Sequence, residues 1–364
     1  MKRAIHPQLP LTQAVEWLLR GGFKSATPGA LLGELCNRLV AEGLPIANVT
    51  LGIASLDPLI SATRLRWQPQ GGRVIEEVML HGMVSRVAAQ DDALRLGFAD
   101  TNHLIEWRSG NAIGFTAQEQ AYLGAVCMAM AAPLEVVIGR SVTRNVLQAY
   151  LGRRSAEKVL NGTVRRGVGE VIEAVVWISD LRGFTLLSET LTSDQVITAL
   201  NDCCARLVGA IQPFGGEVLK FIGDGLLAIF PLADHGEQAA CDAAISAVRA
   251  ARAGMARLDE ERALAGLPPL PFGVALHRGA VMYGNIGAPD RLDFTAIGPA
   301  VNVASRIEEL CRPLACPVLI SEAVAARCTK DLIAAGTHSL RGVARPVALF
   351  TLPGLAAGQA LNSR

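Results

Sequence analysis

Hydrophobic positions recur at helical spacing in the first part of the chain. Residues 28–42 place Leu31, Leu32, Leu35 and Leu39 on one side, a pattern that predicts an amphipathic helix. Two strands are expected next, at residues 48–55 and 62–68, because apolar residues there are bounded by the turn signal Asp57-Pro58. This order of elements indicates an α+β domain.

A second helical pattern begins after Phe115 and runs to about residue 139. Thr116 followed three residues later by Glu119 matches a capping box. Residues 134–160 continue the helical periodicity until Asn161-Gly162 supplies a stop. The continuation has two interpretations: a helix packed on the first domain, or a dimerising connector that transmits strain between domains.

The second half of the chain is rich in strand signals. Residues 174–179 form a β-branched run, and residues 193–211 have helical periodicity. Two strands, 217–222 and 226–230, are joined across Gly223-Asp224-Gly225, a strong hairpin signal. We expect helices at 237–258 and 299–310, and a further hairpin of strands 271–276 and 280–285. The pattern predicts an α+β fold with a largely antiparallel sheet.

Composition limits the class of protein. The 364 residues fit about two domains, and 34 basic against 33 acidic side chains leave no field that would attract nucleic acid. The eight cysteines show no Cys-x-x-Cys pair, so we expect neither disulfides nor zinc, and a reducing cytoplasm. The start lacks the apolar stretch of a signal peptide. Pro133 and Glu135 interrupt the longest apolar run, which favours a buried helix over a membrane span.

Two aspartates carry the candidate chemistry. Asp180 ends one apolar strand pattern and Asp224 interrupts another. Burying unpaired carboxylates is costly, so two in similar settings indicate a shared cation, and oxygen ligands suit two divalent ions. Main-chain N–H groups at residues 182–185 can meet phosphate oxygens where the chain turns. Taken singly, each aspartate also fits plain turn or capping chemistry.

Three blocks make the second half recognisable. They are Ser179-Asp180-Leu181-Arg182-Gly183-Phe184-Thr185, Phe221-Ile222-Gly223-Asp224-Gly225 and Val301-Asn302-Val303-Ala304-Ser305-Arg306. Their order and separation resemble the catalytic domain of class III nucleotidyl cyclases over residues 170–352. The resemblance implies a ferredoxin-like, palm-type fold. It also implies an adenylate cyclase that converts ATP to 3′,5′-cyclic AMP and pyrophosphate.

The resemblance assigns roles to particular residues. Asp180 and Asp224 match the ligands of two Mg²⁺ or Mn²⁺ ions, and the carbonyl of Leu181 is the expected additional ligand. Lys220 and Thr295 match the two positions that read the purine, where a lysine can donate to adenine N1. Asn302 matches the residue that orients the ribose, and Arg306 the residue that stabilises charge on the α-phosphate. The phosphate-facing turn holds Gly183, Phe184 and Thr185.

One position departs from the family pattern. A lysine often holds the terminal phosphates near the C-terminus, but this chain has Val343 at that place. Arg341 or Arg345 is the expected substitute; the alternative is a lower affinity for the triphosphate.

The resemblance further implies a homodimer. In this family the metal aspartates come from one subunit, and Lys220, Thr295, Asn302 and Arg306 come from the other. One chain here carries each set once, so two equivalent sites are expected at a symmetric interface. Asn302 and Arg306 are four apart and would share one face of a helix. The alternatives are a guanylate cyclase, against which Lys220 argues, and a catalytically silent dimerisation or nucleotide-sensing module.

The first part of the chain resembles a divergent GAF domain, a small-molecule sensor. The expected organisation is therefore a GAF-like regulatory domain at residues 1–140, a helical connector at 141–170, the cyclase domain at 171–354 and a tail at 355–364. The regulatory ligand or partner is not specified by the sequence. His81 and His103 are candidate haem or metal ligands, although neither belongs to a ligand-spaced cluster.

Overall fold

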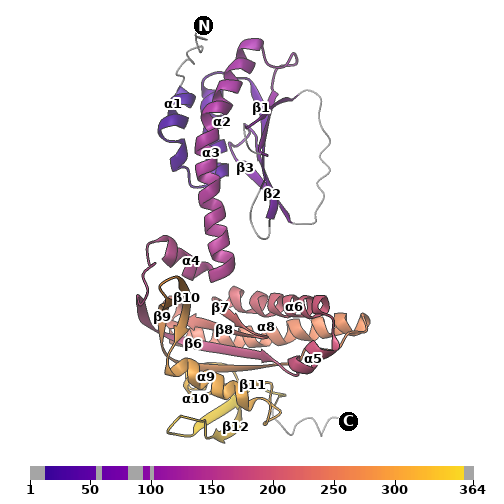
Figure 1. Cartoon of the computed structure of the whole chain (residues 1–364), viewed down its shortest axis with the longest axis vertical. Coiled ribbons are helices and arrows are strands. Elements are labelled where there is room, and N and C mark those ends of the chain that lie inside the picture. The colour runs from indigo at the N-terminus through magenta and orange to yellow at the C-terminus, as the bar shows by residue number, and fades with distance from the viewer. Residues whose placement is uncertain (1–12, 55–59, 81–92, 99–101, 356–364) are drawn as a thin grey trace. The chain divides into compact units, whose positions relative to one another are not determined.

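Figure 1 shows a computed structural model of the chain, which describes residues 13–54, 60–80, 93–98 and 102–355. The chain forms two compact units, Met1–Tyr150 and Leu151–Arg364. The expected turn at Asp57-Pro58, the candidate ligand His81 and residues 356–364 of the tail lie outside the described residues.

The first unit is an α+β structure with a five-stranded antiparallel sheet in the order β3-β2-β1-β5-β4. Its two predicted strands are β1 and β2, and the sequence patterns of the other three were not recognised. The elements of the unit are α1 (Gln13–Arg20), η1 (Gly22–Lys24), α2 (Pro28–Ala41), β1 (Ile46–Ala54), β2 (Ile60–Trp67), β3 (Val74–Leu80), β4 (Leu94–Gly97), β5 (Leu104–Ser109) and α3 (Ala117–Leu151).

The helices of this unit cover one face of its sheet (Figure 1). Alternate residues of β1, among them Val49 and Leu51, are buried against leucines of α2 and against Leu123 and Met130 of α3. The predicted capping box starts α3, with the Thr116 hydroxyl accepting from the Glu119 N–H at 3.3 Å. The Glu119 carboxylate in turn accepts from the Thr116 N–H at 2.7 Å.

α3 is long and apolar enough to cross a bilayer, with a mean hydropathy of 1.8 over its most apolar window. Half of that window is buried inside the protein. Pro133 and Leu134, near its middle, are both buried, and Leu134 belongs to the core. The helix is therefore a core element of its unit.

The second unit contains an eight-stranded mixed sheet. The strand order is β12-β13-β11-β9-β6-β8-β7, with β10 paired to β9; β11 runs parallel to β9, and the remaining pairs are antiparallel. Its elements are α4 (Arg153–Leu160), β6 (Gly169–Leu181), α5 (Phe184–Thr190), α6 (Ser193–Ile211), η2 (Gln212–Phe214), β7 (Glu217–Ile222), β8 (Gly225–Pro231), α7 (Leu232–His235), α8 (Glu237–Leu264), β9 (Phe272–Ala288), β10 (Arg291–Ile297), α9 (Pro299–Leu310), β11 (Val318–Ser321), α10 (Glu322–Ala325), β12 (Ile333–His338) and β13 (Val347–Thr351).

Both faces of this sheet are covered. Val175 and Trp177 of β6 pack with α6 and α8 on one face, whereas Ala174 and Val176 pack with α9 on the other. Figure 1 shows α6 and α8 together on one side of the strands and α9 on the other. A strand buried on both faces reads as a continuous apolar run, which is why residues 174–179 lack polar alternation.

The expected hairpin at residues 271–285 is wrong. The structure has one strand there, β9, whose residues pair with β6 from Gly169↔Gly284 to Leu181↔Phe272. Gly279, between the two expected strands, lies inside β9. A Cβ at this position would come within 2.9 Å of the Ala300 side chain, so the glycine serves the close packing of α9 on the sheet.

Candidate active site

Two aspartates converge at one end of the sheet in the second unit. Asp180 is the penultimate residue of β6, and Asp224 lies in the turn between β7 and β8. β6 pairs with β8, with Ser179 opposite Leu226, so the two segments meet. Both aspartates line one pocket of about 730 Å³. The structure thus brings together the two residues predicted to hold metal ions.

The electrostatics of this pocket favour a cation. Burial raises the pKa of the Asp180 carboxyl, and the nearby charge of Asp224 raises it further. The charge of Arg182 and a hydrogen bond from the backbone of Leu181 oppose the shift. A positive charge between two such carboxylates would relieve their repulsion.

The donor set fits divalent metal ions. The described residues contain no group of three or more His, Cys, Asp or Glu side chains arranged for a metal. Magnesium in nucleotide sites is commonly held by one or two carboxylates together with substrate phosphates. Asp180, Asp224 and the carbonyl of Leu181 fit that mode, in which the nucleotide supplies the remaining ligands.

The chain turns sharply beside the aspartates. Gly183 has a φ of 71°, in the left-handed region that favours glycine, and α5 begins at the next residue. The Arg182 N–H donates to the Pro271 carbonyl at 2.7 Å, which fixes the start of this turn. Gly183, Phe184 and Thr185 all line the pocket.

Lys220 lies outside the aspartate pocket. A β-bulge in β7 falls between Val218 and Lys220, where the pairing with β8 shifts register. The Lys220 ammonium forms an ion pair with the Asp293 carboxylate of β10. Lys220 is about one-third exposed and Asp293 about half exposed, so both charges are open to a ligand.

Thr295, the second predicted purine-reading residue, also lies on β10. Asp293 and Thr295 are two residues apart, so they share one face of the strand. Thr295 is buried, and its enclosed hydroxyl has no hydrogen-bond partner among the described residues. In this conformation Asp293 is the accessible acceptor beside Lys220.

Asn302 and Arg306 lie on α9, one turn apart, which confirms the helix expected from their spacing. The Arg306 guanidinium forms an ion pair with Glu309 on the same helix, and its side chain is 38% exposed. α9 contacts β10, and β10 contacts β7. Lys220, Thr295, Asn302 and Arg306 therefore occupy neighbouring elements, but none of them lines the aspartate pocket.

The arginines expected to hold the terminal phosphates lie away from the aspartate pocket. Arg341 and Arg345 lie in the loop between β12 and β13 and do not line the aspartate pocket. Arg312, which follows α9, does line it. Sequence reasoning missed Arg312 because nothing in its local pattern points to a ligand. It also missed Asp293, although its two-residue spacing from Thr295 was a usable signal.

His103 of the first unit is held by protein groups. Its Nδ1 accepts from the Ala54 N–H at 3.2 Å, and its Nε2 lies 3.2 Å from a Glu135 carboxylate oxygen. The side chain is 8% exposed. Both ring nitrogens therefore have protein partners.

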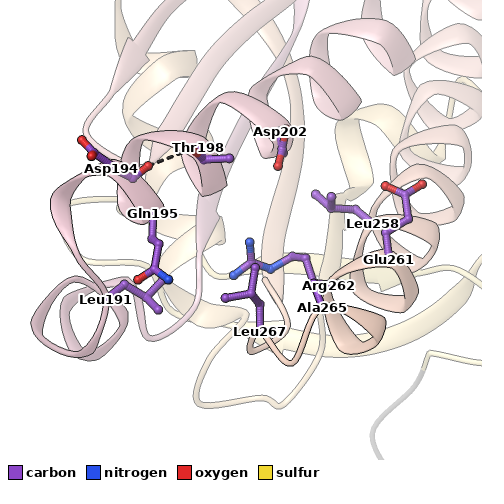
Figure 2. Close-up of a pocket in the computed structure, with 10 residues that line it drawn as sticks. All are labelled: Leu191, Asp194, Gln195, Thr198, Asp202, Leu258, Glu261, Arg262, Ala265 and Leu267. Atoms are coloured by element: carbon purple, nitrogen blue, oxygen red, sulfur yellow. Dashed lines mark hydrogen bonds between the residues drawn. The ribbon is translucent and has the colours of Figure 1, made fainter.

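A separate pocket of about 310 Å³ lies between α6 and α8 (Figure 2). Its polar walls include Asp194, Thr198 and Arg262, and the Thr198 hydroxyl donates to the Asp194 carbonyl at 2.8 Å. Arg262 is 5% exposed and donates through Nε to the Pro268 carbonyl at 2.7 Å. That contact joins the end of α8 to the loop that follows it. None of the predicted site residues lines this pocket.

Comparison with known proteins identifies the domain that carries the aspartates. Residues 170–348 match the family described as the adenylate and guanylate cyclase catalytic domain. These residues form a class III nucleotidyl cyclase domain. The match does not extend to the first unit, so its interpretation as GAF-like stays a prediction.

Similar proteins include adenylate cyclases. The chain is 34% identical over 185 residues to an adenylate cyclase of Anabaena cylindrica, covering 50% of this chain and 35% of that protein. It is 38% identical over 149 residues to the terminal-differentiation specific adenylate cyclase of Dictyostelium discoideum, covering 40% of this chain and 7% of that protein. The structure of a bacterial light-regulated adenylyl cyclase aligns with a TM-score of 0.52 and 25% identity, over 64% of this chain and 67% of that one. The chain thus spans from 7% to 35% of the length of these two curated relatives.

Proposed function

We propose that the protein is an adenylate cyclase that converts ATP to 3′,5′-cyclic AMP and pyrophosphate. The observation that carries the proposal is the pairing of Asp180 with Asp224 in one pocket of a class III cyclase domain. Two relatives named adenylate cyclase support ATP as the substrate. Lys220 supports the same choice, because an ammonium donates to adenine N1, whereas N1 of guanine carries a hydrogen.

The pocket binds the phosphates. Asp180, Asp224 and the carbonyl of Leu181 would hold two divalent ions, which when bound would activate the ribose 3′-hydroxyl and stabilise the pyrophosphate leaving group. The backbone of residues 183–185 and the guanidinium of Arg312 contact the β- and γ-phosphates, since both line this pocket. The 3′-oxygen attacks the α-phosphorus in line and its proton passes to water, while the bond from the α-phosphorus to the oxygen that bridges to the β-phosphate breaks and releases pyrophosphate.

The second group of residues binds the nucleoside. Lys220 donates to adenine N1, and the exocyclic amine donates to Thr295 or to Asp293, whose carboxylate is the more accessible acceptor. Asn302 orients the ribose. Arg306 breaks its ion pair with Glu309 and then stabilises the charge that develops on the α-phosphate.

We infer that the active form is a homodimer in which each site takes the aspartates from one subunit and the nucleoside-binding residues from the other. The two groups occupy different parts of one chain, so neither is a complete site. Large apolar side chains around the Lys220–Asp293 pair are 38% to 55% exposed, which fits a surface that a second copy covers. They are Phe221, Ile222, Met282, Leu292 and Ile297.

The substrate assignment is tested with the purified full chain. Either ATP or GTP is supplied with Mg²⁺ or Mn²⁺, and cyclic AMP or cyclic GMP is measured. We expect cyclic AMP from ATP and little turnover of GTP. Preference for GTP would make the protein a guanylate cyclase and overturn the role of Lys220. No product from either nucleotide would favour a silent dimerisation module.

The shared site is tested by complementation. Asp180→Ala and Arg306→Ala chains should each be inactive, because each homodimer then lacks one half of both sites. Mixed and allowed to exchange subunits, they should recover part of the activity through heterodimers with one intact site. Absence of recovery from chains shown to exchange would refute the shared interface.

We propose that the first unit regulates the enzyme. A pocket of about 190 Å³ in this unit is lined by the start of α2, by strands β1 to β3 and by α3. α3 lines it at residues 138–145 and ends at Leu151, two residues before α4 begins. A visible absorbance spectrum and mass spectrometry of the purified full chain would detect a bound cofactor or metabolite; a ligand found elsewhere in the chain would contradict the proposal.

A further inference from the structure

Arg182 turns away from solvent and binds α9. Its Nη2 forms an ion pair with the Glu308 carboxylate and also donates to the Glu308 carbonyl oxygen at 3.3 Å. The two side chains are 24% and 9% exposed, respectively. Arg182 lies two residues after Asp180, so this contact fastens the metal-binding turn to the helix.

The sequence leaves space for this ion pair. Gly273 of β9 is opposite Asp180 in the β6–β9 ladder. A Cβ on Gly273 would come 1.9 Å from Arg182 Nη2 and 2.8 Å from Glu308 Oε1. Any larger residue at this position would displace the ion pair, so the absence of a side chain at Gly273 is required for it to form.

We propose that Arg182 and Glu308 are positioning residues that couple the two active sites of the dimer. Arg182 lines the aspartate pocket, but its guanidinium is bound to Glu308, so we expect it to act through the turn and not by contact with the substrate. Their ion pair joins the turn that carries Asp180, which serves one site, to the helix that carries Asn302 and Arg306, which serve the other. The coupling rests on the proposed function, because it requires shared sites.

The physical basis is the rigidity of a partly buried ion pair. Removing one partner of such a pair leaves the other charge uncompensated and lets its segment move. Arg306 precedes Glu308 by two residues on α9, so movement of this turn of the helix also moves the guanidinium. Outer groups that orient metal ligands typically change metal affinity or activity on the order of tenfold or more when replaced.

The first test is the variant Glu308→Gln, which keeps the shape and an acceptor but removes the charge. Burial raises the pKa of Glu308 to about 7, so the assay is run at mildly alkaline pH, where the carboxylate is ionised. We expect the apparent Kd for Mn²⁺ to rise on the order of tenfold and kcat to fall. The matched control is Glu261→Gln, which breaks an exposed ion pair with Arg206 of 2.7 Å and should change neither quantity.

The second test separates coupling from general destabilisation. In a heterodimer of Asp180→Ala and Arg306→Ala chains, the live site takes its metal-binding turn from the Arg306→Ala chain. Adding Glu308→Gln to that chain should raise the apparent Kd for Mn²⁺. Adding it instead to the Asp180→Ala chain should lower kcat and leave the metal dependence unchanged, because that chain supplies only α9.

The outcomes distinguish this inference from the proposed function. If the wild-type chain makes no cyclic nucleotide, the proposed function fails, and Mn²⁺ binding by calorimetry still tests whether Glu308 positions the metal-binding turn. If the wild type is active and both placements of Glu308→Gln act alike, the ion pair is merely structural and the coupling is refuted. Equal metal affinity and kcat in Glu308→Gln and wild type would refute the positioning role altogether.

Discussion

Gly225 is the residue on which the approach of the two aspartates depends. It follows Asp224 at the start of β8. An alanine Cβ there would lie 2.7 Å from the Ser179 carbonyl oxygen and 2.9 Å from an Asp180 carboxylate oxygen. The first of these neighbours is backbone in a paired strand, which cannot rotate away. We predict that Gly225→Ala damages both stability and catalysis.

The size of the effect follows from the distances. The Cβ would sit about 0.7 Å short of the 3.4 Å at which ordinary contact begins, so the β6–β8 ladder must open locally. Overpacking of this kind costs about 1–3 kcal/mol. For a unit of this size, that lowers the Tm by roughly 3–10 °C. Displacing Asp180 by a fraction of an ångström should lower kcat about tenfold or more, since a 1 Å error can cost about a hundredfold.

The assay compares Tm and cyclic AMP production in Gly225→Ala and Gly209→Ala. Gly209 is exposed inside α6, and an added Cβ would meet nothing within 4 Å. Gly209→Ala should therefore stabilise the helix by about 0.5–1 kcal/mol and leave activity unchanged. A Gly225→Ala protein with wild-type Tm and kcat would show that the turn relaxes freely, and the argument for a sterically fixed aspartate pair would be refuted.

Two further predictions concern charges. Asp293→Asn removes the carboxylate that holds Lys220, and because both groups are partly exposed the loss is at most about 1 kcal/mol. We expect the ratio of kcat/KM for ATP to that for GTP to fall by up to about fivefold, and an unchanged ratio would exclude Asp293 from base reading. Glu308 has a folded-state pKa raised to about 7 from its usual 4.5, so its contribution to stability is complete below about pH 4.5 and is lost as pH rises through about 7. Glu308→Gln should flatten the dependence of Tm on pH across this window, and parallel curves for the two proteins would contradict the assignment.

The local chemistry of the catalytic segment was predictable from sequence. Asp224 occupies a glycine-flanked turn between two apolar runs, and that pattern specifies a tight hairpin whatever surrounds it. The spacing of Asn302 and Arg306 specifies one face of a helix, which α9 provides. Thr116 begins a helix by accepting a hydrogen bond from the N–H of Glu119, three residues further on, again a local property. Such features need no knowledge of the rest of the fold.

Features that depend on distant packing were not predictable. Gly273 and Gly279 of β9 look alike in sequence, yet one leaves space for the Arg182–Glu308 pair and the other for α9. Glu308 and Glu309 are adjacent, but Glu308 is buried against Arg182 whereas Glu309 is exposed beside Arg306. Which of the two glutamates is buried depends on which face of α9 packs against the sheet, and the residue type alone does not specify that. The strands β3, β4 and β5 were also missed, although β3 pairs with the preceding strand β2 and β4 with the following strand β5; only the pairing of β5 with β1 joins segments far apart in the chain.

The segment from Lys220 to Asp224 places its two ends in different surroundings. Asp224 lies in the turn and faces the pocket with Asp180, whereas Lys220, beside the bulge in β7, pairs with Asp293 of β10. Phe221 and Ile222, between them, are exposed and apolar, although β7 is otherwise part of a packed sheet. Exposed apolar residues at this place fit the proposed interface, where a second chain would cover them. If the sites are shared as proposed, a substitution of Phe221 should weaken dimerisation and activity together, because each site then needs residues from the second chain.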